Sequence, residues 1–244
     1  MASPQEKTSG VVLYKIPYND KMSIVHIYTE QFGRMSYMLT QSAGKKARLQ
    51  RTLFSPFSIL EMEVEHKPGR EIQRIKEARP EIILQNLHYD PVKSAVTLFL
   101  TEILARLVHI PEPNPPFYRF LTNAIQQLDL IEEGKANFHL WFLLKLSGYL
   151  GFYPNGEDYT KGARFDLMNG IFVQEQPAHA WFLKPEEAVH FHTLLKMNSR
   201  NLHLFSFNRE ERVKILEYYM LYFRLHQAGF TELKSLEILK AVFD

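Results

Sequence analysis

The N-terminal third of this chain contains short segments in which residues of one kind recur at every second position. The clearest is Ser23–Thr29, where β-branched and aromatic residues alternate between two sides. A period of two with such residues predicts a strand rather than a helix. The other predicted strands are Val11–Leu13, Met35–Thr40, Phe57–Val64 and Ile72–Ala78. Strands at this spacing, in a stretch too short for two full sheets, favour a small closed barrel.

The chain changes to helical periodicity after Pro80. Asp90 stands before a proline at the start of one periodic segment, which is a favoured N-cap followed by a favoured first helical residue. Asn208 and Glu211 have the spacing of a capping box. The predicted helices are Pro91–His109, Phe117–Ile131, Ala136–Leu150, Pro185–Met197, Asn208–Gln227 and a last helix capped by Thr231.

These patterns together predict an α+β, multi-domain chain. We expect a five-stranded barrel of the oligonucleotide/oligosaccharide-binding (OB) type over residues 1–80. An all-α helical domain is expected over residues 81–244, with an irregular insert at about residues 151–180 that lacks periodicity.

One connection between the predicted strands is basic and free of acidic residues. Between Gln31 and Leu60 the chain has no aspartate or glutamate, and its cations there are Arg34, Lys45, Lys46, Arg48 and Arg51. Residues 42–50 lose the apolar pattern, so we expect a loop there. Residues 1–80 hold thirteen basic and eight acidic residues, whereas residues 81–244 hold sixteen and nineteen. We therefore expect any affinity for a polyanion mainly in the N-terminal part.

The composition limits the chemistry that the chain can perform. It contains no cysteine, which excludes disulfides, thiolate catalysis and cysteine-ligated metals, and is typical of a reducing compartment. The first residues have no apolar core of a signal peptide, and the longest apolar stretch, Phe138–Phe152, is too short to span a bilayer. Gly44-Lys45-Lys46 lacks the other residues of a phosphate-binding loop. We expect a cytoplasmic protein without a membrane partner, a cofactor or an enzymatic activity.

Several landmarks of the sequence occur in the order found in one family. They are Thr8-Ser-Gly-Val-Val-Leu13, Pro17-Tyr-Asn-Asp20, the strand that ends at Thr29 with Gly33 after it, Phe54-Ser-Pro-Phe57 before Leu60, and Leu150-Gly-Phe-Tyr-Pro154. With the first and the last two predicted helices, they cover nearly the whole chain. This ordered set resembles the bacterial DNA repair protein RecO family.

The resemblance implies an OB barrel followed by a helical domain, and a role as a recombination mediator close to the nucleoid. Such proteins bind single- and double-stranded DNA, anneal complementary strands and help to load the recombinase. The partners that the resemblance implies are RecR and the acidic C-terminal tail of single-strand-binding protein, with RecF as a further candidate.

The chain departs from the family pattern at two places. Many members have a four-cysteine zinc site in the segment that is Asn155–Ala180 here, and this segment has no cysteine. Its only obvious ligand types are Asp158, Asp166 and His179, so we expect no metal site. The family often has a Lys-Gly pair at the start of the basic connection, where this chain has Gln41-Ser42.

Two groups of cations are candidate binding sites. The predicted DNA-binding residues are Lys45, Lys46, Arg48, Arg51, Arg34 and Lys21, which would neutralise phosphates. Tyr28, Phe32 and Tyr37 could offer stacking faces for bases, although aromatic residues in a small barrel more often belong to its core. A second basic group could hold an acidic partner tail or more DNA, and consists of Lys196, Arg200, Arg209, Arg212 and Lys214. A solvated helix face explains this second group equally well.

Two other functions remain open on the sequence alone. One is a non-catalytic interaction adaptor whose barrel binds RNA or protein, which would keep partner binding without DNA affinity. The other is a hydrolase whose site has no recognisable motif, which would require turnover that a single carboxylate or histidine substitution removes.

Overall fold

The structure is a computed structural model that describes residues 5–40, 44–109 and 111–242. The chain separates into two compact units, Met1–Leu130 and Ile131–Asp244. Among the described residues, no helix combines the length and the apolar composition needed to cross a bilayer.

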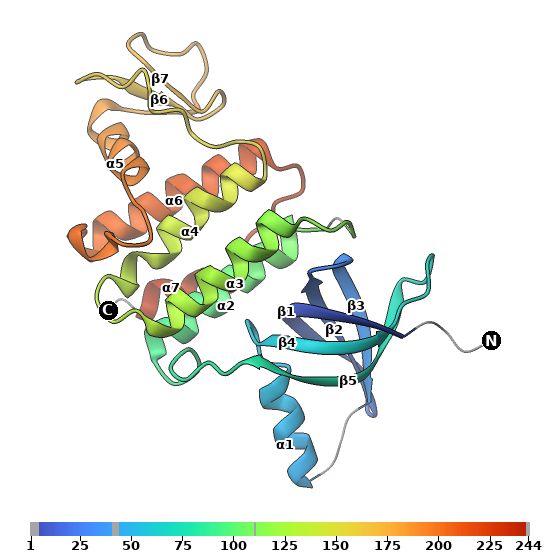
Figure 1. The fold of residues 1–244 in the computed structure, drawn as a ribbon. Helices are drawn as coiled ribbons and strands as arrows, with labels where there is room; N and C mark the ends of the chain where they lie inside the picture. Colours follow the sequence, from blue (N-terminus) through green and yellow to red (C-terminus); the bar gives the residue numbers. More distant parts are fainter. Residues whose placement is uncertain (1–4, 41–43, 110, 243–244) are drawn as a thin grey trace. The chain divides into compact units, whose positions relative to one another are not determined.

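The first unit begins with a closed barrel of five strands (Figure 1). The strands are β1 (Gln5–Asn19), β2 (Met22–Thr29), β3 (Gly33–Thr40), β4 (Ile59–Glu65) and β5 (Ile72–Ile82). They follow the order β1-β2-β3-β5-β4, with β4 also pairing with β1, and only β3 and β5 pair in parallel. Gly33 has a φ of 64°, a conformation that glycine tolerates, in the tight connection between β2 and β3.

Alternation along the strands fills the barrel with apolar side chains. On β3 the inward residues are Met35, Tyr37 and Leu39, and they alternate with half-buried or exposed outward residues. Val25 and Ile27 of β2 point into the same core. The phenol ring of Tyr37 is fully buried, so this residue is part of the core.

The predicted loop over residues 42–50 is wrong from residue 44 onwards, because helix α1 (Gly44–Leu53) begins there, and residues 42–43 lie outside the described part of the chain. Few of its residues are apolar, but lysine, arginine, leucine and glutamine are all good helix formers. Leu53 and the following Phe54 pack against the barrel core and attach the helix to it. Phe57, expected inside a strand, instead lies in the turn before β4 with a φ of 65°.

Two long helices complete the first unit, α2 (Pro91–Leu107) and α3 (Pro115–Leu130). The Asp90 carboxylate caps α2 by accepting hydrogen bonds from the backbone N–H groups of Val92 and Lys93, as the sequence predicts. α2 contacts β1, and Phe117 at the start of α3 packs edge-on against Tyr28 of β2. These contacts cover part of the outer surface of the barrel.

The second unit is mainly helical. Its helices are α4 (Phe138–Tyr149), α5 (Pro185–Leu195), α6 (Arg209–His226) and α7 (Ser235–Val242), with short 3-10 turns at Lys135–Asn137 and Leu202–Leu204. The capping box of Asn208 and Glu211 is present at the start of α6. The segment expected to be irregular contains a small sheet of β6 (Arg164–Asp166), β7 (Ile171–Val173) and β8 (Phe182–Leu183).

Aromatic side chains hold this small sheet to the helices of the second unit. Phe165 of β6 lies against Phe191 of α5 and Tyr222 of α6, with ring centroids 4.6 and 5.9 Å away. Tyr222 also donates a hydrogen bond to the backbone oxygen of Phe152. A five-stranded barrel followed by helices confirms the predicted fold class.

Candidate nucleic-acid interface

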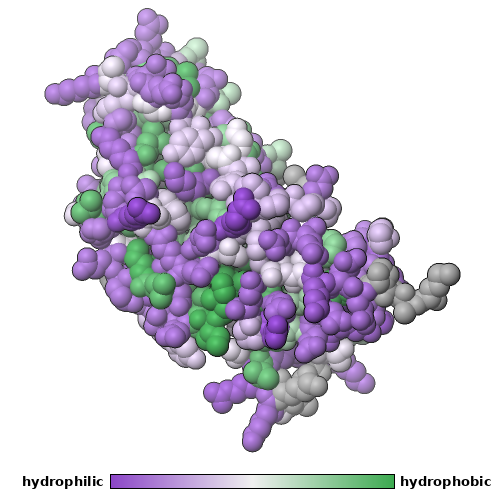
Figure 2. Space-filling model, viewed as in Figure 1, coloured by the Kyte–Doolittle hydropathy of each residue, from purple (hydrophilic) through white to green (hydrophobic). Residues whose placement is uncertain are grey.

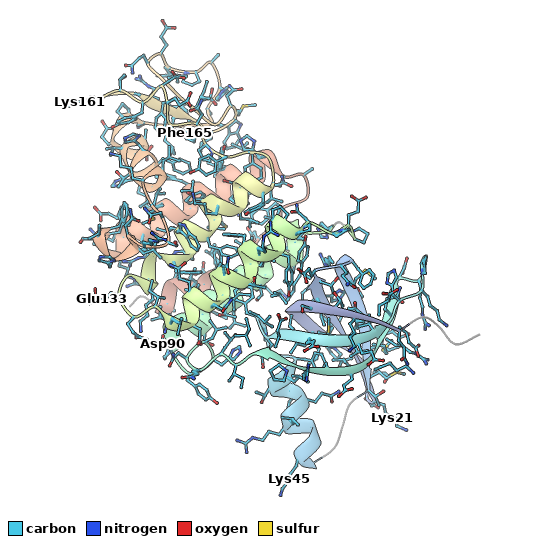
Figure 3. All side chains as sticks on the ribbon, in the orientation of Figure 1. Lys21, Lys45, Asp90, Glu133, Lys161 and Phe165 are labelled. Carbon is cyan, nitrogen blue, oxygen red and sulfur yellow. The ribbon has the colours of Figure 1, made fainter. Side chains whose placement is uncertain are left out.

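Helix α1 presents three exposed cations at one end of the barrel. Lys45, Arg48 and Arg51 are all exposed, and Figure 3 shows Lys45 at the free end of the helix. Lys21 is exposed in the β1–β2 turn, beside Met22, whose strand partner is Thr40 at the end of β3. The turn with Lys21 therefore lies at the end of the barrel from which the chain passes towards α1. Lys46 belongs to α1, but its side chain lies outside the described part of the structure.

The turn between β4 and β5 adds two cations that the sequence patterns do not predict. Lys67 and Arg70 are exposed on either side of Pro68-Gly69. The buried side chain of Gln73 fixes this turn, because its oxygen accepts from the Lys67 N–H at 2.9 Å. Its amide nitrogen donates to the Lys67 and Arg70 carbonyls, both at 2.8 Å. The sequence does contain a signal for this site. It is a pair of cations on either side of a Pro-Gly turn, directly after a predicted strand.

The outer face of β1, β2 and β3 lies between these two turns. Tyr14, His26 and Ser36 are neighbours across the three strands, and the Tyr14 and His26 rings stack with centroids 4.3 Å apart. Burial and, second, the charge of Arg34 lower the pKa of His26 to about 4, so the imidazole is neutral at pH 7. Tyr18, which is 59% exposed, extends the aromatic surface along β1.

Of the three aromatic residues considered for base stacking, two are buried. Tyr37 lies in the barrel core, and Tyr28 is covered by Phe117 of α3. Phe32 is half-buried and stacks on His66, with ring centroids 4.2 Å apart, beside a cavity of about 560 Å³ that Lys67 and Arg70 also line. Tyr14 and Tyr18 lie beyond the expected end of the first strand, so the sequence does not identify them as stacking faces.

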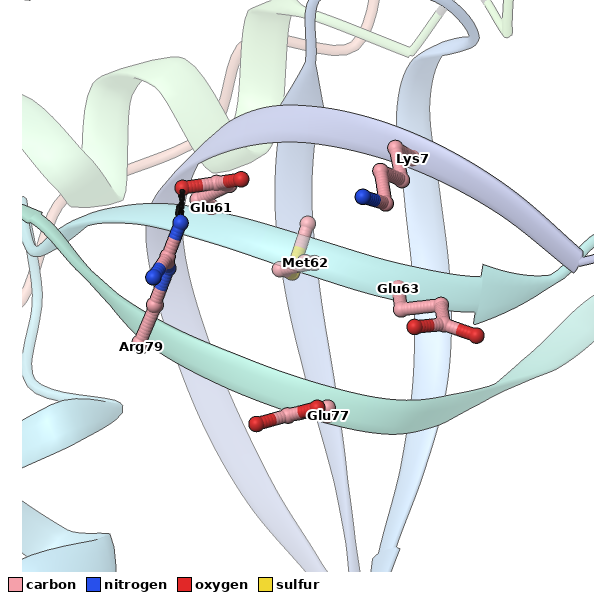
Figure 4. A pocket seen from close by; sticks show the side chains of 6 residues that line it. All are labelled: Lys7, Glu61, Met62, Glu63, Glu77 and Arg79. Atoms are coloured by element: carbon pink, nitrogen blue, oxygen red, sulfur yellow. Dashed lines mark hydrogen bonds and ion pairs between the residues drawn. The ribbon is translucent and has the colours of Figure 1, made fainter.

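The opposite outer face of the barrel, on β1, β4 and β5, has a hollow lined mainly by charged side chains (Figure 4). Glu63 stands between Lys7 and Glu77 across the strands, and Glu61 lies beside Arg79 in the next row. The Arg79 guanidinium and the Glu61 carboxylate approach to 2.6 Å. Three glutamates and two cations line this hollow, so the hollow has a small net negative charge that is unfavourable for a polyanion. Farther along the same strands, Glu65 is paired with Lys76 at 2.6 Å.

Arg34, which the sequence predicts to bind DNA, is half-buried and makes hydrogen bonds within the first unit. One guanidinium nitrogen donates to the backbone oxygens of Ala105 and Val108 at the end of α2, both at 2.7 Å. The other nitrogen donates to the Tyr14 hydroxyl at 2.7 Å. The guanidinium therefore links β3 to the carboxyl end of α2, where a cation also interacts favourably with the helix dipole.

This geometry predicts that Arg34 contributes strongly to stability. In the Arg34→Ala variant, the helix-end carbonyls lose a charged donor, and we expect the free energy of unfolding to fall by about 2–4 kcal/mol. Urea unfolding followed by circular dichroism measures the loss. The exposed Arg70 provides the matched control, since Arg70→Ala removes the same charge without these hydrogen bonds. Equal stability of the two variants would contradict the role.

The structure does not bring the second basic group together as one surface. Arg209 and Lys214 line an open hollow of about 810 Å³ on α6, together with Lys240, two glutamates (Glu210 and Glu217), Asn208 and Val213. Lys196 and Arg200 are exposed in the connection after α5. Arg212 instead donates to the Asn137 side-chain oxygen at 3.2 Å and to the Phe207 carbonyl at 2.8 Å, and is half-buried. The hollow is therefore the part of this group best placed to bind a partner.

The fully buried His139 of α4 makes the second unit sensitive to acid. Burial and, second, the charge of Arg212 lower the pKa of this imidazole to about 3, compared with 6.5 in an unfolded chain. Below pH 6.5 the unfolded chain binds a proton that the folded chain does not bind. We expect stability to fall by roughly 1 kcal/mol per pH unit between pH 6 and pH 4 from this residue alone. Urea unfolding at several pH values should show a shallower dependence for His139→Leu, and an unchanged dependence would contradict the assignment.

Residues 155–180 are organised around a buried carboxylate. Asp166 accepts from the N–H groups of Met168 and Asn169 at 2.9 and 3.1 Å, and from the Asn169 side chain at 2.8 Å. His179 lies 3.3 Å from the same carboxylate. Burial raises the pKa of Asp166, but these hydrogen bonds outweigh it and lower the pKa overall. Within the described ranges, no group of three or more potential metal ligands occurs.

Comparisons with known proteins agree with this architecture. The family model described as "Recombination protein O N terminal" matches residues 1–82, and "Recombination protein O C terminal" matches residues 88–237. The DNA repair protein RecO of Azobacteroides pseudotrichonymphae is 44% identical over 238 residues, covering 98% of this chain and 99% of the relative. RecO of Phocaeicola vulgatus is 41% identical with the same coverage, and RecO of Flavobacterium psychrophilum is 35% identical over 98% and 99%. The chain therefore belongs to the RecO family of DNA repair proteins.

Proposed function

We propose that this chain is a non-catalytic recombination mediator that binds single- and double-stranded DNA, anneals complementary strands and assists recombinase loading together with RecR. The family membership supports a role in recombinational DNA repair. The observation that carries the more specific proposal is the uneven charge of the barrel surface.

Exposed cations lie on α1, at one end of the barrel, and on the turns that contain Lys21 and Lys67, whereas the hollow on the β1–β4–β5 face has more glutamates than cations. A nucleic-acid strand would cross the basic side, with phosphates near Lys45, Arg48, Arg51 and Lys21. Lys67 and Arg70 would extend the track to the other edge of the face. Lys46 is included as a phosphate contact because it belongs to α1. Arg34 is included because its hydrogen bond to the Tyr14 hydroxyl positions that ring.

Annealing requires no bond chemistry, which fits a site made of cations and aromatic rings. Two single strands repel each other through their phosphates, and cations on the protein reduce this repulsion. The stacked Tyr14–His26 pair and the exposed Tyr18 offer faces on which bases of a strand could rest without sequence preference. The protein would thus hold strands in a form that is open to pairing.

The partners are part of the proposal. The hollow beside Arg209 and Lys214 is proposed to hold the acidic tail of single-strand-binding protein, since its three cations outnumber its two glutamates. Two of the cations already have partners, because Lys240 pairs with Glu217 and Lys214 with Glu187. RecR and RecF are proposed from the family resemblance, and no surface is assigned to them. Activity on DNA would place the protein in the cytoplasm at the nucleoid.

Fluorescence anisotropy with labelled single- and double-stranded oligonucleotides tests the proposal. We expect binding of both forms without sequence preference, and a dissociation constant that rises steeply with salt because each phosphate contact releases counterions. Absence of binding to both forms would refute the proposal. Binding to RecR in the absence of DNA affinity would instead favour the interaction adaptor.

A further inference from the structure

An apolar groove lies between α1 and the end of β5 in the first unit. It has a volume of about 380 Å³, and its walls are contributed by α1, the start of β4 and residues 78–88. The apolar side chains that line it are Leu49, Leu53, Ile59, Leu60, Ala78, Pro80, Ile82, Ile83 and Leu84. The groove adjoins the hollow on the β1–β4–β5 face, since Arg79 lines both, whereas none of the described residues lines both the groove and the cavity beside Phe32.

Two of these apolar side chains are largely exposed to water, which is energetically unfavourable. Leu49 is 70% exposed and Ile83 is 79% exposed, and they line the groove from opposite walls. Figure 2 shows apolar surface where α1 meets the segment that follows β5. Contiguous apolar surface of this kind is typical of a site that a partner covers.

Among the described residues that line the groove, none is aspartate or glutamate, and the one with a permanent charge is Arg79. Arg79 already pairs with Glu61 at 2.6 Å, so the cations left near the groove are those of α1. Lys45 lies one helical turn before Leu49, so the two share a face of α1. Arg48 lies on the adjacent edge of the helix, since it precedes the lining residue Thr52 by four positions. A peptide that fills the groove would therefore gain from acidic residues beside its apolar ones.

Pro80 limits how an occupant can bind. The edge of β5 beyond Arg74 has no partner strand on the β3 side among the described residues. A proline in this part of the strand has no N–H group to donate to an added strand. The groove is therefore suited to the insertion of side chains rather than to the addition of a strand.

We propose that this groove is a docking site for a segment of a partner protein that combines large apolar side chains with acidic ones. The apolar side chains would cover Leu49 and Ile83, and the acidic ones would lie near Lys45 and Arg48 of α1. This site does not depend on the proposed DNA function, although it shares α1 with it. Arg51 faces away from the groove and stays available to DNA.

A labelled peptide tests the docking site on the full chain. The probe is a short fluorescein-labelled peptide in which leucine and phenylalanine alternate with aspartate and glutamate, and anisotropy reports its binding. We expect the Leu49→Ser/Ile83→Ser double variant to bind it about tenfold more weakly or worse, because the peptide can no longer cover two apolar side chains. Leu204, which is 70% exposed in the second unit, gives the matched control Leu204→Ser, which should bind like the wild type.

Two further peptides separate apolar from electrostatic recognition. A version with serine in place of leucine and phenylalanine should not bind, and a version with lysine in place of the acidic residues should bind more weakly than the original. Equal binding of the original peptide by the wild type and the double variant would overturn the proposal. Stronger binding of the lysine version than of the original peptide would also overturn the proposal.

Photo-crosslinking gives a second measurement that does not depend on a variant. A benzoylphenylalanine in the peptide should attach to residues 49–53 or 78–84, and attachment elsewhere would overturn the proposal. DNA binding by the double variant should equal that of the wild type, because its cations are intact. The proposal of the docking site and the proposal of the DNA interface can therefore be refuted independently.

Discussion

Reversing the charge of the basic residues of α1 is expected to remove most of the DNA affinity. The variant carries Lys45→Glu, Lys46→Glu, Arg48→Glu and Arg51→Glu. Because about four phosphates would no longer be neutralised, the slope of log Kd against log salt for single-stranded DNA should become shallower by about three, at roughly 0.7 per phosphate. At low salt the affinity should fall on the order of a hundredfold or more. Anisotropy titrations at several salt concentrations measure both quantities.

The control for this experiment has the same change in net charge at other exposed positions. It carries Arg119→Glu, Lys161→Glu, Arg224→Glu and Lys234→Glu, all exposed and outside the proposed track. This control should lose affinity only modestly, through the general repulsion that net charge produces at long range. If both variants lost affinity equally, net charge rather than α1 would explain binding, and the proposed interface would be refuted.

Replacing Asp129 should cause the largest loss of stability in the first unit. This buried residue, in the last turn of α3, accepts hydrogen bonds from the backbone N–H groups of Gln85, Asn86 and Leu87, at 2.7–3.0 Å. Its backbone oxygen also accepts from the buried ammonium of Lys93 at 2.9 Å. In Asp129→Ala, three backbone donors lose their acceptor and the Lys93 charge loses a nearby carboxylate. We expect a loss of about 3–5 kcal/mol in the free energy of unfolding.

Urea unfolding of the wild type and of three variants measures this loss of stability and its origin. Asp129→Asn keeps one acceptor oxygen without the charge, so its stability should lie between that of the wild type and that of Asp129→Ala. Asp90→Ala removes a single helix cap and should cost only about 1 kcal/mol. A cost for Asp129→Ala as small as that of Asp90→Ala would show that the carboxylate does not hold the connection between β5 and α2.

The barrel is predictable because its inward residues are strongly apolar at alternate positions. The capped starts of α2 and α6 are equally visible, since Asp90 and Asn208 act on backbone groups within three residues. The residues that form such features are close together in the sequence, so the pattern can be recognised without the fold. They identify both the OB barrel and the helical region that follows it.

Features that depend on distant contacts are not predictable in this way. Arg34 is expected from the sequence to bind DNA, but its partners Ala105 and Val108 are 71 and 74 residues away in the chain. The last part of β1 escapes prediction because shifts in its register after Val12 and after Pro17 interrupt the alternation. Helix α1 resembles a loop in the sequence because Leu53 and Phe54, rather than a continuous apolar stripe, hold it on the barrel.

The candidate site is therefore predictable in part. The basic stretch that contains Lys45, Arg48 and Arg51 is visible because it lacks acidic residues. The turn with Lys67 and Arg70 is hidden because its cations are mixed with glutamates in the sequence. The fold places Glu61, Glu63 and Glu77 in the hollow on the β1–β4–β5 face, whereas Glu71 lies beside the turn. Whether these residues contact DNA stays a prediction.

Annealing of complementary strands tests the central proposal most directly. Two complementary oligonucleotides, one with a fluorophore and one with a quencher, are mixed with the wild-type protein or the α1 charge-reversal variant, and the rate of quenching is followed. We predict that the wild type accelerates annealing, that salt suppresses the acceleration, and that the variant lacks it. A wild-type protein that binds neither strand and leaves the rate at its spontaneous value would contradict the proposal.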